Sequence, residues 1–195
     1  MKAQHYLFLG LAGLAVTAIF IFYHRPTPVL RHPYDFSAPC PGKEKTIKMN
    51  DNYMIGAVEF GQELKLIPNW YWCHPAGRGD LVLLRFAPNL EPVVRRIYAV
   101  AGDEFQVTYN KMQGAWNIEV NHQKLKLNGQ DYFFGANSEQ TPPLLKLLES
   151  SRKGVLLDRE IIVFSSRPPG NRDSGTLGVV NLNDVIGKIE DKGSN

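Results

Sequence analysis

The sequence predicts a mainly β protein: an antiparallel barrel or sandwich with one short inserted helix, preceded by an N-terminal transmembrane helix. Three observations predict this fold class. An uncharged apolar stretch lies near the N-terminus, a proline-rich segment follows it, and short β-type runs separated by turn residues fill the remainder. We therefore divide the chain into a membrane anchor (1–24), a tether (25–45) and a β domain (46–190).

The apolar stretch Tyr6–Tyr23 carries no charge over 18 positions, which is the lower end of what spans a bilayer as a helix. A cleavable signal peptide would have an apolar region of about 7–15 residues followed by small residues at the cut site. Here Arg25 and Pro26 follow instead, so an uncleaved anchor is expected. The flanking charges, Lys2 on one side and Arg25 and Arg31 on the other, do not set its orientation.

Five prolines between Arg25 and Gly42 predict an extended tether. Beyond it, each expected strand is bounded by Gly, Pro, Asn or Asp. These strands are 64–67, 80–86, 93–100, 104–109, 116–120 and 160–164. Between Thr141, a helix-capping residue, and Gly154, a run of leucines at helical spacing predicts the single inserted helix, packed on the sheet.

Charge and cysteine content limit the partners and ligands. The net charge of +3 is spread along the chain without a Lys/Arg run, so no nucleic acid is expected as a partner. Cys40 and Cys73 both lie beyond the anchor, and an even count fits a disulfide in an oxidising compartment, with two unpaired thiols as the alternative. The chain has no C-x-x-C or H-x-x-x-H spacing, and we predict neither a metal nor another cofactor.

Three segments occur in a fixed order. Tyr53–Gly61 reads YMIGAVEFG, Gly79–Asp103 holds the runs GDLVLLRF and VRRIYAVAGD, and Gly170–Lys188 holds GNRDSGTLGVV and VIGK. Together they resemble the type I signal peptidases, membrane-anchored serine peptidases with a Ser/Lys dyad that include the conjugal-transfer peptidases. The resemblance covers residues 5 to 190. It implies the signal peptidase fold, with the β domain on the extracytoplasmic, periplasmic side of the inner membrane.

The resemblance also assigns roles to individual positions. It places Tyr53 where the family has its nucleophile and Arg95 where it has its base. The other positions it implies are Met54, Gly56 and Arg96 for substrate binding, and Asp103, Asp173 and Ser174 as supporting residues.

The residue types at these positions do not suit peptide hydrolysis. Arginine stays protonated and has no acceptor lone pair, so Arg95 cannot act as a general base. The ring of Tyr53 would move its hydroxyl away from the serine position, a misplacement that catalysis does not tolerate. Gly56 replaces a family proline, and Gly175 replaces the arginine of the late Asp-Ser-Arg motif. We therefore predict a degenerate dyad.

Three functions remain open. In the first, the chain is a non-catalytic signal peptidase homologue that binds extended leader or substrate segments of exported proteins, in a secretion, pilus or conjugation assembly. Alternatively, it is an active peptidase with an unorthodox or misaligned dyad, or a structural membrane-anchored β domain. The aromatic cluster Trp70–Trp72 fits membrane lipid at an interface as well as it fits a core.

Overall fold

The computed structural model of the chain describes residues 42–50, 54, 56–127, 129–134, 146–147, 149–150, 154–166 and 172–190. All of them belong to one compact unit, Tyr34–Asn195. The expected anchor, Tyr6–Tyr23, and most of the tether lie outside the described residues. Within the described part, no helix has the length and apolarity needed to span a bilayer.

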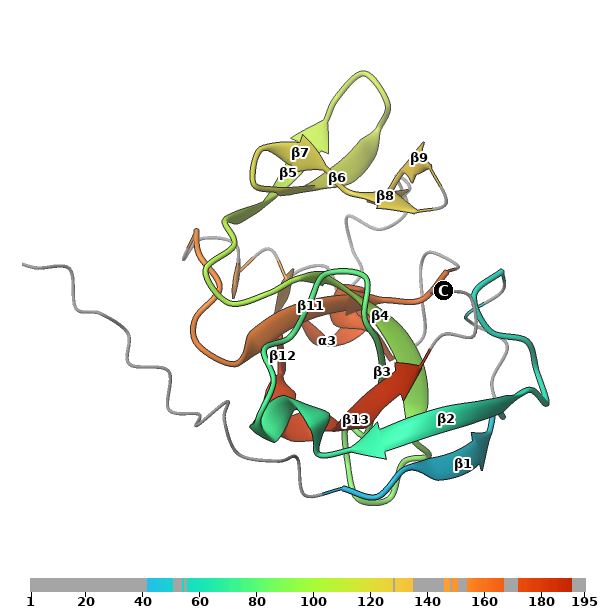
Figure 1. Cartoon of the computed structure of the whole chain (residues 1–195). Helices are drawn as coiled ribbons and strands as arrows, with labels where there is room; N and C mark the ends of the chain where they lie inside the picture. Colours follow the sequence, from blue (N-terminus) through green and yellow to red (C-terminus); the bar gives the residue numbers. More distant parts are fainter. Residues whose placement is uncertain are drawn as a thin grey trace, which may run out of the picture. The chain divides into compact units, whose positions relative to one another are not determined.

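A seven-stranded antiparallel sheet forms the main body of the domain (Figure 1). Its strand order is β1-β2-β13-β3-β4-β11-β12. The strands are β1 (Lys45–Lys48), β2 (Glu63–Pro68), β13 (Val185–Glu190), β3 (Leu81–Leu84), β4 (Val93–Ala99), β11 (Glu160–Phe164) and β12 (Val180–Asn181).

The last strand, β13, lies between β2 and β3 and so joins the N-terminal and central parts of the domain. This insertion requires a glycine at position 187, because a Cβ atom there would lie 2.3 Å from the Ile67 carbonyl oxygen of β2. Residues from β2, β3, β4 and β13 build one apolar cluster with Met49, Met54 and Val58. The C-terminal strand therefore holds together the segments that contain the predicted site.

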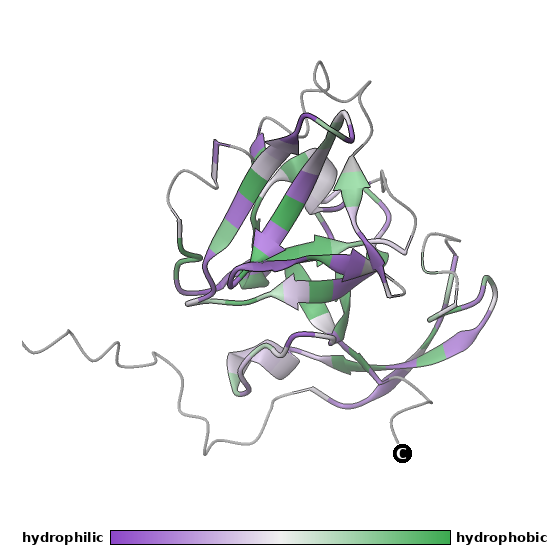
Figure 2. Cartoon of the chain, turned by 90° about the horizontal axis from the view of Figure 1, so that it is seen from above, coloured by the Kyte–Doolittle hydropathy of each residue, from purple (hydrophilic) through white to green (hydrophobic). Residues whose placement is uncertain are grey.

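A second sheet consists of β5 (Phe105–Asn110), β6 (Ala115–Val120), β7 (Gln123–Lys124) and β10 (Phe133–Phe134). A short pair, β8 (Lys126–Leu127) and β9 (Gln130–Asp131), follows it in the chain. Hydropathy alternates in bands along the longer strands (Figure 2), as expected for strands with one buried face. Phe105, Val107 and Ile118 supply that buried face, which packs on Ile162 and Phe164 of β11.

The structure confirms the mainly antiparallel β class. All six predicted strands exist, with ends that differ from the prediction by no more than two residues. In the predicted helix, the described residues 146–147 and 149–150 are helical, and Leu147 is fully buried in the cluster shared by β5, β6 and β11.

Several elements were missed by the sequence analysis. They are β1, β13 and the two-residue strands, the short helix α3 (Ser174–Leu177), and two 3₁₀ turns, η1 (Trp70–Trp72) and η3 (Leu182–Asp184). The aromatic cluster in η1 had been expected either at a membrane interface or in the core, and its members differ in exposure. Tyr71 is buried, whereas Trp72 keeps 60% of its surface exposed.

Candidate functional site

Arg95 is a fully buried cation in the middle of β4. Strand alternation places its side chain on the same face as Val93 and Ile97, which belong to an apolar cluster. Its Nε donates to the Arg172 carbonyl oxygen at 3.2 Å, and its Nη1 donates to the Val94 carbonyl oxygen at 2.5 Å. Arg95 is therefore held by main-chain acceptors, one of them in the late segment of the chain.

That late segment is organised by Asp173, which is also fully buried. Its Oδ1 accepts from the Gly175 N–H at 2.9 Å, which caps the N-terminus of α3. Its Oδ2 accepts from the N–H and the hydroxyl of Ser165, each at 3.3 Å. Ser174 is buried as well, and its hydroxyl oxygen accepts from the Val163 N–H at 2.9 Å. Asp173 and Ser174 thus fasten the late segment to β11.

The electrostatics of this centre are dominated by burial. Burial raises the pKa of Asp173 above its ordinary value, against the hydrogen bond from the Ser165 N–H and the positive charge of Arg95, which both lower it. The charge of Arg95 therefore acts on the carboxylate of Asp173, and the two form one buried polar centre.

Arg96 and Asp103, the other predicted residues of this region, lie elsewhere. Arg96 is on the opposite face of β4 from Arg95, and its Nη1 donates to the Gly79 carbonyl oxygen at 2.7 Å. Asp103 accepts from Nε of Arg78 at 2.8 Å and from the Val100 N–H at 2.9 Å. Both side chains brace the turns at the ends of β3 and β4.

Tyr53 lies outside the described residues, so the predicted nucleophile position has no described geometry. Its neighbour Met54 is buried in the cluster that contains Val94. Gly56 is exposed, with a φ of 84°. Because proline is restricted to a φ near −65°, the family proline could not occupy this backbone conformation. The turn after Met54 is therefore built for glycine.

Cys73 is disulfide-bonded and buried. Its predicted partner, Cys40, lies outside the described residues, and the Cys40–Cys73 pairing stays a prediction.

A groove of about 420 Å³ lies beside the buried centre. One wall is the chain segment 47–50, which comprises the end of β1 and the two residues after it, and the other is formed by Glu91, Pro92 and Val94. Leu83 and Arg172 complete the lining. Segments that are distant in sequence thus meet at one hollow, and Arg172 links its lining to Arg95.

The wall formed by β1 has a free edge within the described part of the domain, because β1 is the terminal strand of its sheet. Met49 donates its N–H to the Gln62 carbonyl oxygen at 2.9 Å, and Ile47 pairs with Leu64. Backbone groups of alternate residues in an antiparallel strand point to opposite edges, so those of Lys48 point away from β2. An extended segment could add to this edge as a further strand.

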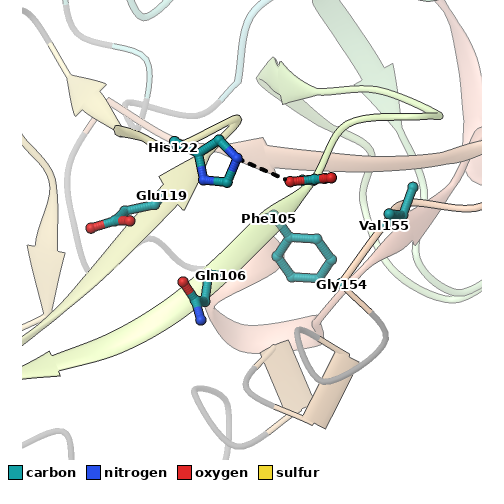
Figure 3. Close-up of a pocket in the computed structure, with 7 residues that line it drawn as sticks. Phe105, Gln106, Glu119, His122, Gly154 and Val155 are labelled. Atoms are coloured by element: carbon teal, nitrogen blue, oxygen red, sulfur yellow. Dashed lines mark ion pairs between the residues drawn. The ribbon is translucent and has the colours of Figure 1, made fainter.

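A second hollow, of about 260 Å³, lies on the solvent side of β5 and β6 (Figure 3). His122 faces Glu104, with its Nε2 3.2 Å from a carboxylate oxygen, and Glu119 and Gln106 lie beside them. Both members of the ion pair are more than half exposed, at 88% and 58%. Such pairs contribute little energy in water, and the lining of this hollow includes neither Arg95 nor Asp173.

Sequence reasoning missed three residues of the first site. Arg172 was visible only as part of the Asn-Arg-Asp run, and its role depends on contacts with β4 and with Glu91 in the loop before it. Ser165 gave no signal, because it binds Asp173 from a strand end eight residues earlier. Glu91 reaches the groove through the loop before β4 and could not be assigned from local sequence.

The described hydroxyls and the cation of this centre limit the acid–base chemistry that these groups can perform. Ser165 and Ser174 are both buried, with 1% or less of their surface exposed. Arg95, the buried cation of the centre, cannot accept a proton. Among the described residues, therefore, no hydroxyl that solvent can reach is paired with a base at this centre.

Comparison with known proteins supports the family resemblance of the chain. The family model described as "Signal peptidase, peptidase S26" matches residues 5–191. Nothing among the curated proteins matches the chain. Among solved structures, the chain is similar to the crystal structure of a signal peptidase I from Enterococcus faecalis. The identity is 17%, the match covers 60% of this chain and 98% of that chain, and the TM-score is 0.41.

Proposed function

Since this chain belongs to the signal peptidase family, we propose that it is a membrane-anchored member that binds extended segments of exported proteins without cleaving them. The observation that carries this proposal is the state of Arg95. A family peptidase needs a neutral base at this position, and here a permanently charged guanidinium is fully buried and bonded to two carbonyl oxygens.

The groove supports the binding half of the proposal. Its volume of about 420 Å³ lies in the range of ligand pockets in proteins. Its lining includes the buried apolar residues Met49, Leu83 and Val94, which can receive an apolar side chain. The free edge of β1 offers main-chain donors and acceptors along the same wall, as strand addition requires.

The membrane half of the proposal depends on the apolar stretch Tyr6–Tyr23 and on family membership. An anchor there would keep the groove near the membrane that exported proteins cross, with the domain on the extracytoplasmic side. Leader peptides, and the secretion, pilus or conjugation assembly that exports them, are the partners that follow.

The test uses the purified full chain in a non-ionic detergent with a fluorescent leader peptide. Fluorescence anisotropy should report binding, whereas chromatography of the same mixtures should show no hydrolysis. Lys48→Pro should weaken binding, because proline removes the N–H that points to the free edge of β1. Thr46→Pro is the matched control, since it removes an N–H on the same edge but away from the groove.

Two results would contradict the proposal. Hydrolysis by the wild-type chain that is lost in Tyr53→Phe would establish an active, tyrosine-dependent peptidase. Equal loss of binding in the Lys48→Pro and Thr46→Pro variants would show that the peptide does not add along the groove. A Tyr53→Ser, Arg95→Lys double variant measures how much activity the dyad alone restores, and we expect none, because the Gly56 turn and Gly175 also differ from the family.

A further inference from the structure

Arg172 lies at the rim of the groove and is fixed at both its main chain and its side chain. Its carbonyl oxygen accepts from Nε of Arg95 at 3.2 Å, and its own Nη1 donates to the Glu91 carbonyl oxygen at 2.8 Å. Its φ of 56° is in the left-handed region, and the next residue, Asp173, begins the cap of α3. The guanidinium is therefore positioned by the fold across the groove from β1.

This guanidinium carries unused binding capacity. It has five N–H donors, of which the Glu91 carbonyl takes one. Within the described residues, Arg172 forms no ion pair with any carboxylate. The carboxylate of Glu91, the acidic group of the groove lining, pairs neither with Arg172 nor with Lys48, the other cation of that lining. The charged groups of the lining are thus two cations and one anion.

The buried apolar residues of the groove lining, which we call its apolar floor, lie next to this rim. Met49, Leu83 and Val94 are 9% exposed or less, and Ile47 packs against the same cluster. An extended segment that seats an apolar side chain on this floor passes the guanidinium of Arg172 within one or two residues, because both line a single groove. A carboxylate at that point would meet N–H donors arranged for a bidentate contact.

We propose that the groove selects extended peptides that carry an apolar side chain followed or preceded closely by a carboxylate, which Arg172 binds. This inference rests on the proposed peptide-binding function and names its preferred ligand. The carboxylate could belong to an Asp or Glu side chain or to the C-terminus of a peptide, and the two sources share the same chemistry.

The experiment compares fluorescent nonapeptides with one central leucine, using the full chain in a non-ionic detergent. One pair carries Glu or Gln two residues after the leucine, and a second pair carries them two residues before it. A third pair lacks Glu and ends, two residues after the leucine, in a free carboxylate or an amide. We expect about three- to tenfold tighter binding for at least one carboxylate peptide than for its neutral partner. This preference should weaken as the salt concentration rises.

Variants assign the preference to a residue. Arg172→Gln should remove the preference but keep the binding of the neutral peptides, whereas Arg172→Lys should retain part of it. Lys111→Gln, an exposed lysine in the turn after β5, is the matched loss of one positive charge and should leave the preference unchanged. Thermal unfolding of each variant checks that the fold is kept.

The outcomes separate this inference from the function on which it rests. If the carboxylate and neutral peptides bind equally, the selectivity is wrong and peptide binding stands. A preference that survives in Arg172→Gln would also overturn the assignment to this residue. If no peptide binds, both proposals fail together.

Discussion

Asp103 and Asp173 both interact with an arginine, yet their carboxyl groups shift in opposite directions. Burial raises the pKa of each group. At Asp103, hydrogen bonds from Arg78, the Val100 N–H and Asn121 outweigh burial, and the pKa falls below its ordinary value. At Asp173, burial outweighs the Ser165 hydrogen bonds and the charge of Arg95, and the pKa rises.

The difference lies in where each arginine is. The side chain of Arg78 is 50% exposed and contacts Asp103 directly with two nitrogens, so it needs little desolvation to stabilise the carboxylate. Arg95 is fully buried, and it donates hydrogen bonds to the carbonyl oxygens of Val94 and Arg172. The first pair strengthens a turn from the surface, whereas the second places two desolvated charges in one centre at a high cost.

The largest expected effect separates the two arginines. Arg95→Met should lower the free energy of unfolding by about 3 kcal/mol, because it leaves the buried Asp173 without a compensating positive charge and the carbonyl oxygens of Val94 and Arg172 without this donor. Arg78→Met, the matched change at the exposed pair, should lower it by about 1 kcal/mol or less. Urea denaturation of the two variants measures both values. Equal losses would mean that the buried and exposed pairs do not differ as described.

A double-mutant cycle should give the next largest effect. If Arg95 chiefly compensates the charge of Asp173, Arg95→Met should cost less in an Asp173→Asn background than in the wild type. We expect a coupling of about 1–2 kcal/mol from urea denaturation of the four proteins. Additive losses would show that Arg95 serves only its carbonyl acceptors.

The smallest effect is in the pH dependence of stability, and its sign differs between the two aspartates. A lowered pKa means that the contribution of Asp103 is present above about pH 4 and is lost as the pH falls through the folded-state pKa. A raised pKa means that Asp173 destabilises the ionised protein, and that this penalty grows as the pH rises from about 4 through its folded-state value.

Asp103→Asn and Asp173→Asn variants make this contrast measurable. The stability of the wild type relative to Asp103→Asn should increase with pH in the acidic range, whereas its stability relative to Asp173→Asn should decrease with pH above about 4. Thermal unfolding across a pH series reports both trends. Parallel trends would contradict the opposite pKa shifts.

The strands could be predicted where local pattern and turn residues coincide. β11 was predicted with its observed bounds, since Ile161 and Val163 lie in a β-branched run that begins directly after the Asp158–Arg159 turn. β13 was missed as a strand although its segment Val185–Lys188 had been recognised as part of the late block. Its alternation is weak, and its place between β2 and β3 depends on pairings with residues about 100 positions away.

Only part of the predicted site could be derived from the sequence, because the rest depends on pairing between strands that are distant in the chain. Residue type alone established that Arg95 is not a base. The burial of Arg95, its bond to Arg172 and the position of Arg96 on the opposite face come from the pairing of β4 with its neighbours. The sequence showed Gly56 only as a departure from the family proline, whereas its φ of 84° shows a turn that proline cannot adopt.

The sequence by itself determined the family, the mainly β class and the chemical incapacity of Arg95, because these depend on residue identity, order and short-range pattern. Only the tertiary structure decided that Arg95 and Asp173 are buried, that Arg172 binds Arg95 from the rim of a groove, and that segment 47–50 faces Pro92 across that groove. Charges and apolar surfaces acquire their energies from the surroundings that folding gives them. Those surroundings here are built by segments up to about 120 residues apart, which no local pattern encodes.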